Sequence, residues 1–115
     1  LGCAQLEKMP EFIKQKRALT AFYEELVAPL EGVTLFKEPA NSFSNYWLQT
    51  LILDDTLVRD DVLAFLNDHG VMSRPIWTPL HKLKPYRDCP RADLSTIERL
   101  NKKIINIPST PIKEG

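Results

Sequence analysis

The chain has 115 residues, of which 43% are hydrophobic, and its fifteen basic and fifteen acidic residues give a formal net charge of zero. This size and composition suffice for the core of one domain without support from disulfides or metals. A balanced charge creates no long-range positive field, so we expect neither nucleic acid nor an anionic membrane surface as a partner.

The thiols and imidazoles form no recognisable metal or redox motif. Cys3 and Cys89 make no CxxC pair, and only His69 and His81 could join them as ligands. No apolar run reaches the roughly 20 residues that cross a bilayer, and the first residues lack the basic-then-apolar pattern of a signal peptide. We therefore expect a cytoplasmic protein without a metal.

The first part of the sequence predicts two helices. Apolar residues recur at three- and four-residue steps over residues 11–28, which gives one hydrophobic helix face. Pro10 is tolerated in the first turn of such a helix, so residues 2–8 are expected to form a separate short helix. The chain starts as helix interior, with neither Met nor a capping residue, which indicates a piece of a longer polypeptide.

Two β-prone runs follow at residues 33–36 and 45–53, with a loop at residues 39–44 between them. Acceptor side chains should then cap a helix over residues 58–69, where free N–H groups and the helix dipole favour negative charge. The capping residues are Asp54, Asp55 and Thr56. The inward side chains would be Val58, Val62, Leu63, Phe65 and Leu66, and Gly70 would end the helix.

The rest of the sequence predicts a strand at 71–77, a loop at 85–91, a helix at 93–103 and a final strand at 104–107. This order of elements predicts an α+β fold, with helices packed on a small sheet of mainly antiparallel strands. No internal repeat or second hydrophobic unit is visible, so residues 1–115 are expected to form one domain.

Polar and aromatic side chains concentrate between residues 71 and 87. Pro75, Pro79 and Pro85 fix backbone dihedrals there, so little ordering entropy is lost when the segment meets a ligand. Such a rigid segment suits the wall of a pocket. The candidate site residues are Arg74, Trp77, His81 and Tyr86.

Each candidate has a structural alternative. An imidazole changes charge near neutral pH, but a single histidine such as His81 without a visible partner also serves as a structural hydrogen-bonding group. Arg74 could bind a phosphate or carboxylate bidentately, or pair with an acid at a sheet edge. Trp77 and Tyr86 could stack on a sugar or base, or pack in the core.

Several other kinds of site are excluded or weak. No GxSxG, glycine-rich phosphate loop or HExxH motif occurs. The adjacent carboxylates at 54–55 and 60–61 surround a helix start, so we interpret them as helix-dipole charges rather than acid/base catalysts. A basic group near the candidate site is interpreted as a solvated loop rather than a nucleic-acid patch. It comprises Lys82, Lys84, Arg87 and Arg91.

Three segments of the sequence resemble the DegT/DnrJ/StrS group. They are Leu1-Gly2-Cys3-Ala4-Gln5-Leu6-Glu7, then Ser73-Arg74-Pro75-Ile76-Trp77 leading to Leu80-His81, and Ile104-Ile105-Asn106-Ile107-Pro108-Ser109. That group comprises pyridoxal-phosphate-dependent aminotransferases of fold type I that place an amino group on nucleotide-linked keto sugars. The resemblance covers essentially all 115 residues. The Arg-Pro-Ile-Trp variant is most similar to members that act on UDP-linked 4-keto-6-deoxy N-acetyl sugars.

The resemblance implies that residues 1–115 are the C-terminal small domain of a longer enzyme, with residues 1–9 as the tail of an inter-domain helix. The Schiff-base lysine, the aspartate on the pyridine nitrogen and the group stacked on the cofactor ring would all belong to the large domain. Neither Lys82 nor Lys84 lies in the family's lysine context. The fragment alone is therefore expected to hold no pyridoxal phosphate and to be inactive.

By the same resemblance, the loop from Arg74 to His81 borders the sugar-nucleotide pocket. It implies a substrate contact for His81 first, then for Trp77 and Arg74, and last for Tyr86, because matching positions in the family vary in residue type. The parent enzyme would take the amino group from glutamate and work as a homodimer. Two alternatives without catalysis stay open: a free-standing interaction domain that docks through the long helix, and an independent nucleotide-binding module.

Overall fold

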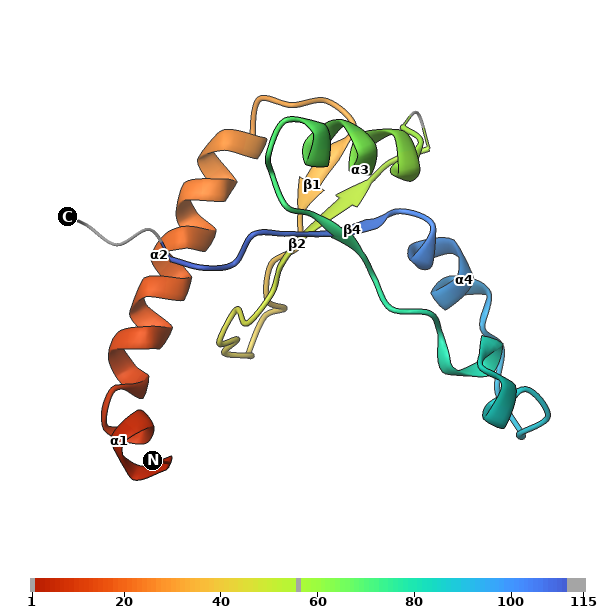
Figure 1. Ribbon diagram of the computed structural model, residues 1–115, viewed down its shortest axis with the longest axis horizontal. Helices are drawn as coiled ribbons and strands as arrows, with labels where there is room; N and C mark the ends of the chain where they lie inside the picture. Colours follow the sequence, from red (N-terminus) through yellow and green to blue (C-terminus); the bar gives the residue numbers. More distant parts are fainter. Residues whose placement is uncertain (1, 56, 112–115) are drawn as a thin grey trace.

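A small antiparallel sheet with helices packed against it forms the centre of the molecule (Figure 1). The computed structural model describes residues 2–55 and 57–111. Its helices are α1 (Gly2–Glu7), α2 (Met9–Val27), α3 (Arg59–Asp68) and α4 (Ser95–Asn101), with the short 3-10 turns η1 (Leu80–Lys82) and η2 (Lys84–Tyr86). Its strands are β1 (Val33–Leu35), β2 (Gln49–Leu53), β3 (Arg74–Pro75) and β4 (Ile104–Ile107). The strand order is β1-β2-β4-β3 with every neighbouring pair antiparallel, which confirms the predicted α+β class.

The two predicted N-terminal helices are confirmed, and Pro10 explains why they are separate. Pro10 occupies the first turn of α2, where its missing N–H costs no intrahelical hydrogen bond. Farther along α2, Leu19 is buried, and the hydroxyl of Tyr23 donates to Pro108 O at 2.9 Å. This bond ties the helix to the chain that leaves β4.

The core lies on the face of the sheet that α2 and α3 both contact. Every second side chain of β2 is buried, as expected of a strand that is covered on one side. Leu53 is 1% exposed and Ile105 is 0% exposed. The buried cluster consists of Leu35, Leu51, Leu53, Ile105 and Ile107. Around it pack Tyr23 and Val27 from α2, and Val62, Leu63 and Leu66 from α3.

The strand predicted over residues 45–53 is confirmed only from the first residue of β2 onward. Tyr46 has a φ of 45°, which does not fit a β-strand. The N–H groups of Tyr46 and Trp47 donate instead to the side chains of Ser44 and Asn45, each at 3.0 Å. Such local bonds compete with strand pairing. As a result Trp47 lies outside the sheet and is 66% exposed.

The helix predicted over residues 58–69 is confirmed as α3, but its predicted cap is wrong. Val58 occupies the N-cap position, and Asp60 and Asp61 supply the negative charge of the first turn. Asp54 and Asp55 precede that position, so they are too far upstream to cap the helix. Thr56 lies outside the described residues.

Two of the side chains predicted to point inward from this helix do not. Val58 is 62% exposed and Phe65 is 60% exposed, with the Phe65 ring packed on His69 at a centroid distance of 4.1 Å. A helix turns by about 100° per residue, so the inward stripe formed by Val62, Leu63 and Leu66 leaves position 65 on the flank. The helix ends before Gly70 as predicted, since the φ of 79° there favours glycine.

The strand predicted at 71–77 is reduced to the two residues of β3. Pro75 has no N–H, so it cannot donate to a longer ladder. The turn before β3 is held by the Asn67 amide, which donates to Ser73 O and accepts from Ser73 N, both at 3.1 Å. The helix predicted over residues 93–103 is also shorter in the structure, where it forms α4. The strand predicted over residues 104–107 is confirmed as β4.

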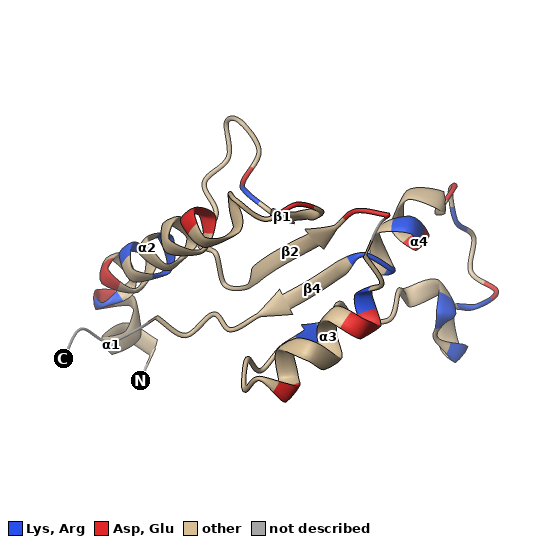
Figure 2. Cartoon of the chain, turned by 90° about the horizontal axis from the view of Figure 1, so that it is seen from above, with Lys and Arg blue, Asp and Glu red and all other residues tan. Residues whose placement is uncertain are grey.

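The segment from η1 to α4 projects away from the sheet (Figure 1). The radius of gyration is 16.6 Å, whereas about 13 Å is typical of a compact domain of this length. Basic and acidic residues are interspersed along the elements in Figure 2, in keeping with the balanced net charge. Within residues 2–55 and 57–111, no helix has the length and apolar character needed to cross a membrane.

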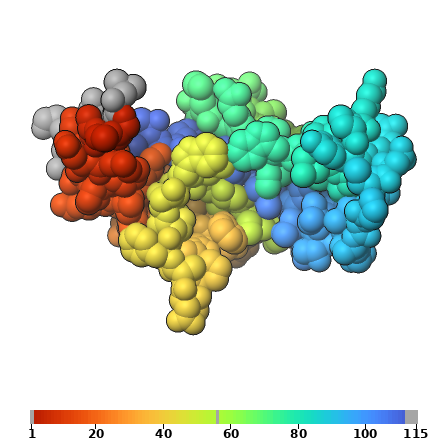
Figure 3. Space-filling view, turned by 90° about the horizontal axis from the view of Figure 1, so that it is seen from below, coloured from red at the N-terminus to blue at the C-terminus, as the bar shows by residue number. Residues whose placement is uncertain are grey.

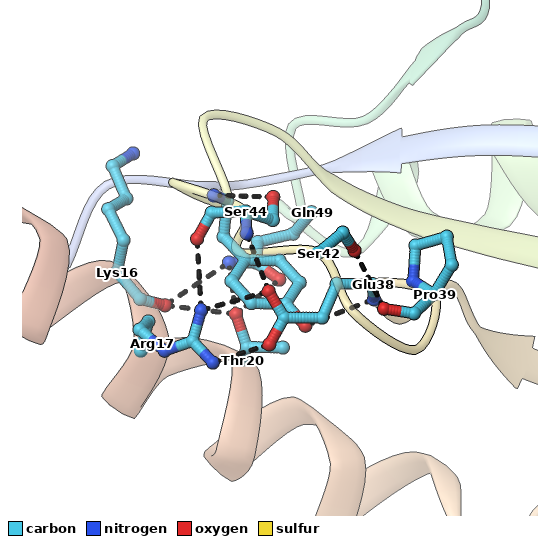
Figure 4. A network of polar contacts seen from close by, with 9 residues as sticks. Lys16, Arg17, Thr20, Glu38, Pro39, Ser42, Ser44 and Gln49 are labelled. Carbon is cyan, nitrogen blue, oxygen red and sulfur yellow. Dashed lines mark hydrogen bonds and ion pairs between the residues drawn. The ribbon is translucent and has the colours of Figure 1, made fainter.

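An ion pair holds the loop between β1 and β2 against α2 (Figure 4). Arg17 donates to both carboxylate oxygens of Glu38, at 3.0 and 2.5 Å, and to Ser44 O at 3.0 Å. Glu38 also accepts from Ser44 N at 2.5 Å. The guanidinium lies 4.3 Å from the ring centroid of Phe43 and 5.3 Å from that of Tyr46. The hydrogen bonds from Arg17 and then Ser44 lower the pKa of Glu38 to about 2.

Acid should weaken this loop in a defined pH range. Because the pKa of Glu38 is lowered from 4.5 to about 2 in the folded chain, its contribution to stability is complete above pH 4.5 and is lost as the pH falls toward 2. Glu38→Gln should therefore lower the thermal midpoint at pH 7 by a few degrees and flatten its decline over that range. Glu25→Gln, at an exposed acid of α2, is the control. A Glu38→Gln profile parallel to that of the native chain would contradict the prediction.

Candidate functional site

His81 lies in η1 and contacts α4. The turn is closed by Leu83 N, which donates to Leu80 O at 2.9 Å. Nε2 of His81 lies 3.1 Å from Oε1 of Glu98, and the His81 side chain is 14% exposed. The histidine thus has a defined direction and a partner that the sequence alone did not reveal.

His81 and Tyr86 border the same hollow, which has a volume of about 420 Å³ and lies between the 3-10 turns and α4. Its lining residues are Pro79, Leu80, His81, Tyr86, Cys89, Pro90, Arg91, Leu94 and Ile97. Mostly apolar walls with a few polar groups are the usual form of a small-molecule site. The structure therefore brings these two candidates together on one concave surface.

Trp77 lies outside this hollow and is stacked on Trp47. The ring centroids are 6.4 Å apart, the ring planes meet at 25°, and each residue is 66% exposed. The backbone is anchored by Asn101, whose Nδ2 donates to Trp77 O at 3.2 Å. In Figure 3 the loop before β2, in yellow, meets the segment after β3, in green to teal, in the middle of the visible face. The two rings are surface groups, so the alternative that Trp77 packs in the core is wrong.

Trp47 is a candidate that the sequence reasoning missed, because the predicted strand placed it in the sheet. It also borders a second hollow of about 320 Å³, formed by the loop between β1 and β2. The signal that could have found it is the pair Ser44-Asn45, whose side chains favour turns and divert the backbone before β2.

Arg74 and Arg91 are placed differently with respect to the hollow at His81. Arg74 is exposed on β3 opposite Asn106, and it is not part of the lining of the hollow at His81. Arg91 does line that hollow, and it donates to Arg87 O at 3.1 Å. Arg91 lies in an exposed loop, which agrees with the solvated-loop interpretation, but its place on the wall of the hollow was not predicted from the sequence.

Asp60 and Asp61 lie in the first turn of α3, as the helix-dipole interpretation predicts, whereas Asp54 and Asp55 lie upstream of that helix, so the interpretation is wrong for them. Asp60 and Asp55 each form a surface ion pair. Asp60 accepts from Arg59 Nε at 2.8 Å, and Asp55 lies 2.6 Å from the Lys103 ammonium. Among residues 2–55 and 57–111, no three His, Cys, Asp or Glu side chains lie close enough to hold a metal ion. Both cysteines are exposed free thiols.

Comparison with known proteins gives the family. The model of the DegT/DnrJ/EryC1/StrS aminotransferase family matches residues 1–113, and the chain belongs to that family. It is 32% identical to GDP-perosamine synthase of Vibrio cholerae over 114 aligned residues. The alignment covers 96% of this chain and 31% of that protein. The chain is 37% identical to the putative pyridoxal phosphate-dependent aminotransferase EpsN of Bacillus subtilis (strain 168) over 81 aligned residues. That alignment covers 70% of this chain and 21% of that protein.

Solved structures agree in fold. The crystal structure of DesI in the presence of its TDP-sugar product matches with a TM-score of 0.82 and 31% identity, over 94% of this chain and 29% of that chain. PseC of Helicobacter pylori, at 17% identity, shares the fold with a TM-score of 0.81. The chain therefore spans less than a third of the length of these relatives.

The described residues do not fit a site for pyridoxal phosphate, the cofactor of this family. Such a site needs a lysine that reaches the aldehyde carbon and backbone donors around the phosphate. No lysine lines the hollow at His81, and the neighbouring Lys82 and Lys84 are exposed. We therefore assign no Schiff-base lysine to the hollow at His81.

Proposed function

We propose that the chain is the C-terminal small domain of a pyridoxal-phosphate-dependent aminotransferase that transfers an amino group from glutamate to a nucleotide-linked 4-keto-6-deoxy sugar. Family membership and the nucleotide-sugar names of two relatives support this proposal. The resemblance of the Arg74-Pro75-Ile76-Trp77 segment to members of the family that act on UDP-linked N-acetyl sugars favours a substrate of that kind. Residues 1–115 form a single domain, and residues 1–9 continue a helix from the domain before it. The parent enzyme is a homodimer, and the fragment alone is inactive.

The exposure of large apolar side chains supports a larger parent. Phe43 is 72% exposed, Met72 is 70% exposed, and the two stacked tryptophans are each 66% exposed. Trp47 and Trp77 are stacked on each other at the surface, and exposed apolar groups that lie together are typical of interaction sites. The projecting segment and the large radius of gyration agree with a domain that is completed by further polypeptide.

The hollow that His81 and Tyr86 share is the observation that carries the site proposal. We assign His81 a direct contact with the sugar, with Tyr86 on the same wall. Trp77 and Arg74 lie on the neighbouring surface, where the aromatic ring can stack on a sugar or base and the guanidinium can bind a phosphate. These residues bind and orient the nucleotide sugar, and the large domain, with its cofactor, supplies the proton transfers.

His81→Ala in the full-length enzyme tests this assignment. Loss of a substrate contact that a partly buried imidazole makes should lower turnover of the keto sugar by about 10- to 100-fold. The half-reaction with glutamate should stay near its native rate, because the amino acid does not use this contact. His69→Ala, the same change on the other histidine, is the control and should affect neither reaction. Equal losses in both half-reactions would remove His81 from the substrate contacts.

A further inference from the structure

We infer that Glu98 is a positioning residue for His81: its carboxylate decides which imidazole nitrogen carries hydrogen and which is left for the ligand. The inference rests on the proposed function, because Glu98 matters through the substrate contact of His81. The two residues are 17 positions apart in the sequence and belong to different elements, α4 and η1.

The contact between His81 and Glu98 joins two backbone segments, η1 and α4, and each segment is ordered by its own hydrogen bonds. Oε1 of Glu98 lies 3.1 Å from Nε2 of His81. Glu98 N donates to Leu94 O at 2.9 Å at the start of α4, just as the bond from Leu83 N closes η1. Because both ends are already ordered, little conformational freedom is lost when the two side chains meet.

The chemistry of the pair defines the ring that a ligand meets. An ionised carboxylate only accepts hydrogen bonds, so it selects the forms of the ring that carry hydrogen on Nε2. In the neutral ring, Nδ1 then has a lone pair and accepts. In the protonated ring, Nδ1–H donates, and the carboxylate offsets the positive charge. In both forms Nδ1 of His81 remains for a ligand, and a sugar hydroxyl, which donates and accepts, suits either form.

The exposure of the two side chains separates this role from a structural one. The Glu98 side chain is 50% exposed and that of His81 is 14% exposed. Truncation of Glu98 therefore leaves neither a cavity nor a buried unpaired charge. An effect of that truncation on activity would act through the direction and form of the imidazole.

The test uses the full-length holoenzyme. Glu98→Ala should lower kcat/KM for the keto sugar by about 5- to 10-fold, the size of one lost hydrogen bond of ordinary net strength at a half-exposed carboxylate, and should leave the glutamate half-reaction and the thermal midpoint unchanged. Glu98→Gln should recover part of the loss, because its amide oxygen still accepts. The double variant with His81→Ala should be no slower than His81→Ala alone. Asp93→Asn, at an acid just before the same helix, should change none of these values.

If the losses in kcat/KM of Glu98→Ala and His81→Ala multiply in the double variant, the inference is overturned. An equal loss in the keto-sugar and glutamate half-reactions of Glu98→Ala would overturn it as well. Nitrogen-15 spectra of histidine-labelled enzyme give a readout that does not depend on turnover. The native ring should carry hydrogen on Nε2, and the Glu98→Ala ring should be a mixture of forms. An unchanged ring would overturn the positioning role. A changed ring with native sugar turnover would support that role and overturn the substrate contact of His81 instead.

Discussion

Ile105→Ala should remove about 2–5 kcal/mol from the free energy of unfolding. Ile105 is 0% exposed and lies in β4 between β2 and β3, opposite Leu51 on one side and Pro75 on the other. Its loss leaves a cavity in the middle of the sheet that neighbouring strands cannot close, because their backbones are fixed by the ladder. For a domain whose total stability is only about 5–15 kcal/mol, this is a large fraction. The midpoint of urea unfolding measures it.

Ile97→Ala is the matched control for the core substitution. Ile97 lies in α4 and is 48% exposed, so removal of the same atoms should cost less than about 1 kcal/mol. If the two substitutions shift the urea midpoint equally, the buried cluster around Ile105 does not carry the stability of the fold.

Thr20→Val should cost about 1–3 kcal/mol, whereas Gln49→Leu should cost clearly less. Gln49 is 1% exposed and Thr20 is 5% exposed. The Gln49 amide donates to Thr20 Oγ1 at 2.9 Å, and the Thr20 hydroxyl lies 3.0 Å from Lys16 O, to which it donates. Valine at position 20 leaves the buried Gln49 amide with only its longer contact, from Nε2 to Lys16 O at 3.4 Å. Leucine at position 49 leaves the Thr20 hydroxyl with the carbonyl of Lys16, to which it donates in the native network (Figure 4).

The double variant of Thr20 and Gln49 completes the cycle. With both polar groups replaced, no buried donor lacks an acceptor, so its unfolding free energy should lie above that of Thr20→Val alone. The measurement is urea unfolding of all four proteins under the same conditions. Additive losses would show that the two side chains are not coupled, and a larger loss for Gln49→Leu than for Thr20→Val would contradict the predicted asymmetry.

Local signals were enough to predict the helices at the start of the chain and the last strand. Pro10 and the apolar repeat define α2, and three of the four residues of β4 are β-branched isoleucines. The strand before Gln49 was predicted too long because Ser44 and Asn45 bind neighbouring N–H groups, a contact that depends on side-chain geometry rather than on composition.

The candidate site was predictable only in part. The resemblance pointed to His81 and Tyr86, and the structure places both on one hollow. Glu98 could not be found in this way, because it meets His81 through packing between separate elements. For Trp47 the turn-favouring pair Ser44-Asn45 was a local signal of its exposure, but its stacking on Trp77 depends on the fold. Arg74 and Arg91 illustrate the same limit, since only the fold determines which of them reaches the hollow.

The strand order leaves β1 and β3 at the two edges of the sheet. Exposed edges with unpaired backbone groups are where chains join into fibrils. Here one edge strand has three residues and the other has two, and the second residue of β3 is Pro75, which cannot donate to an incoming strand. Despite its exposed aromatic rings, the domain is therefore a poor template for amyloid-like growth.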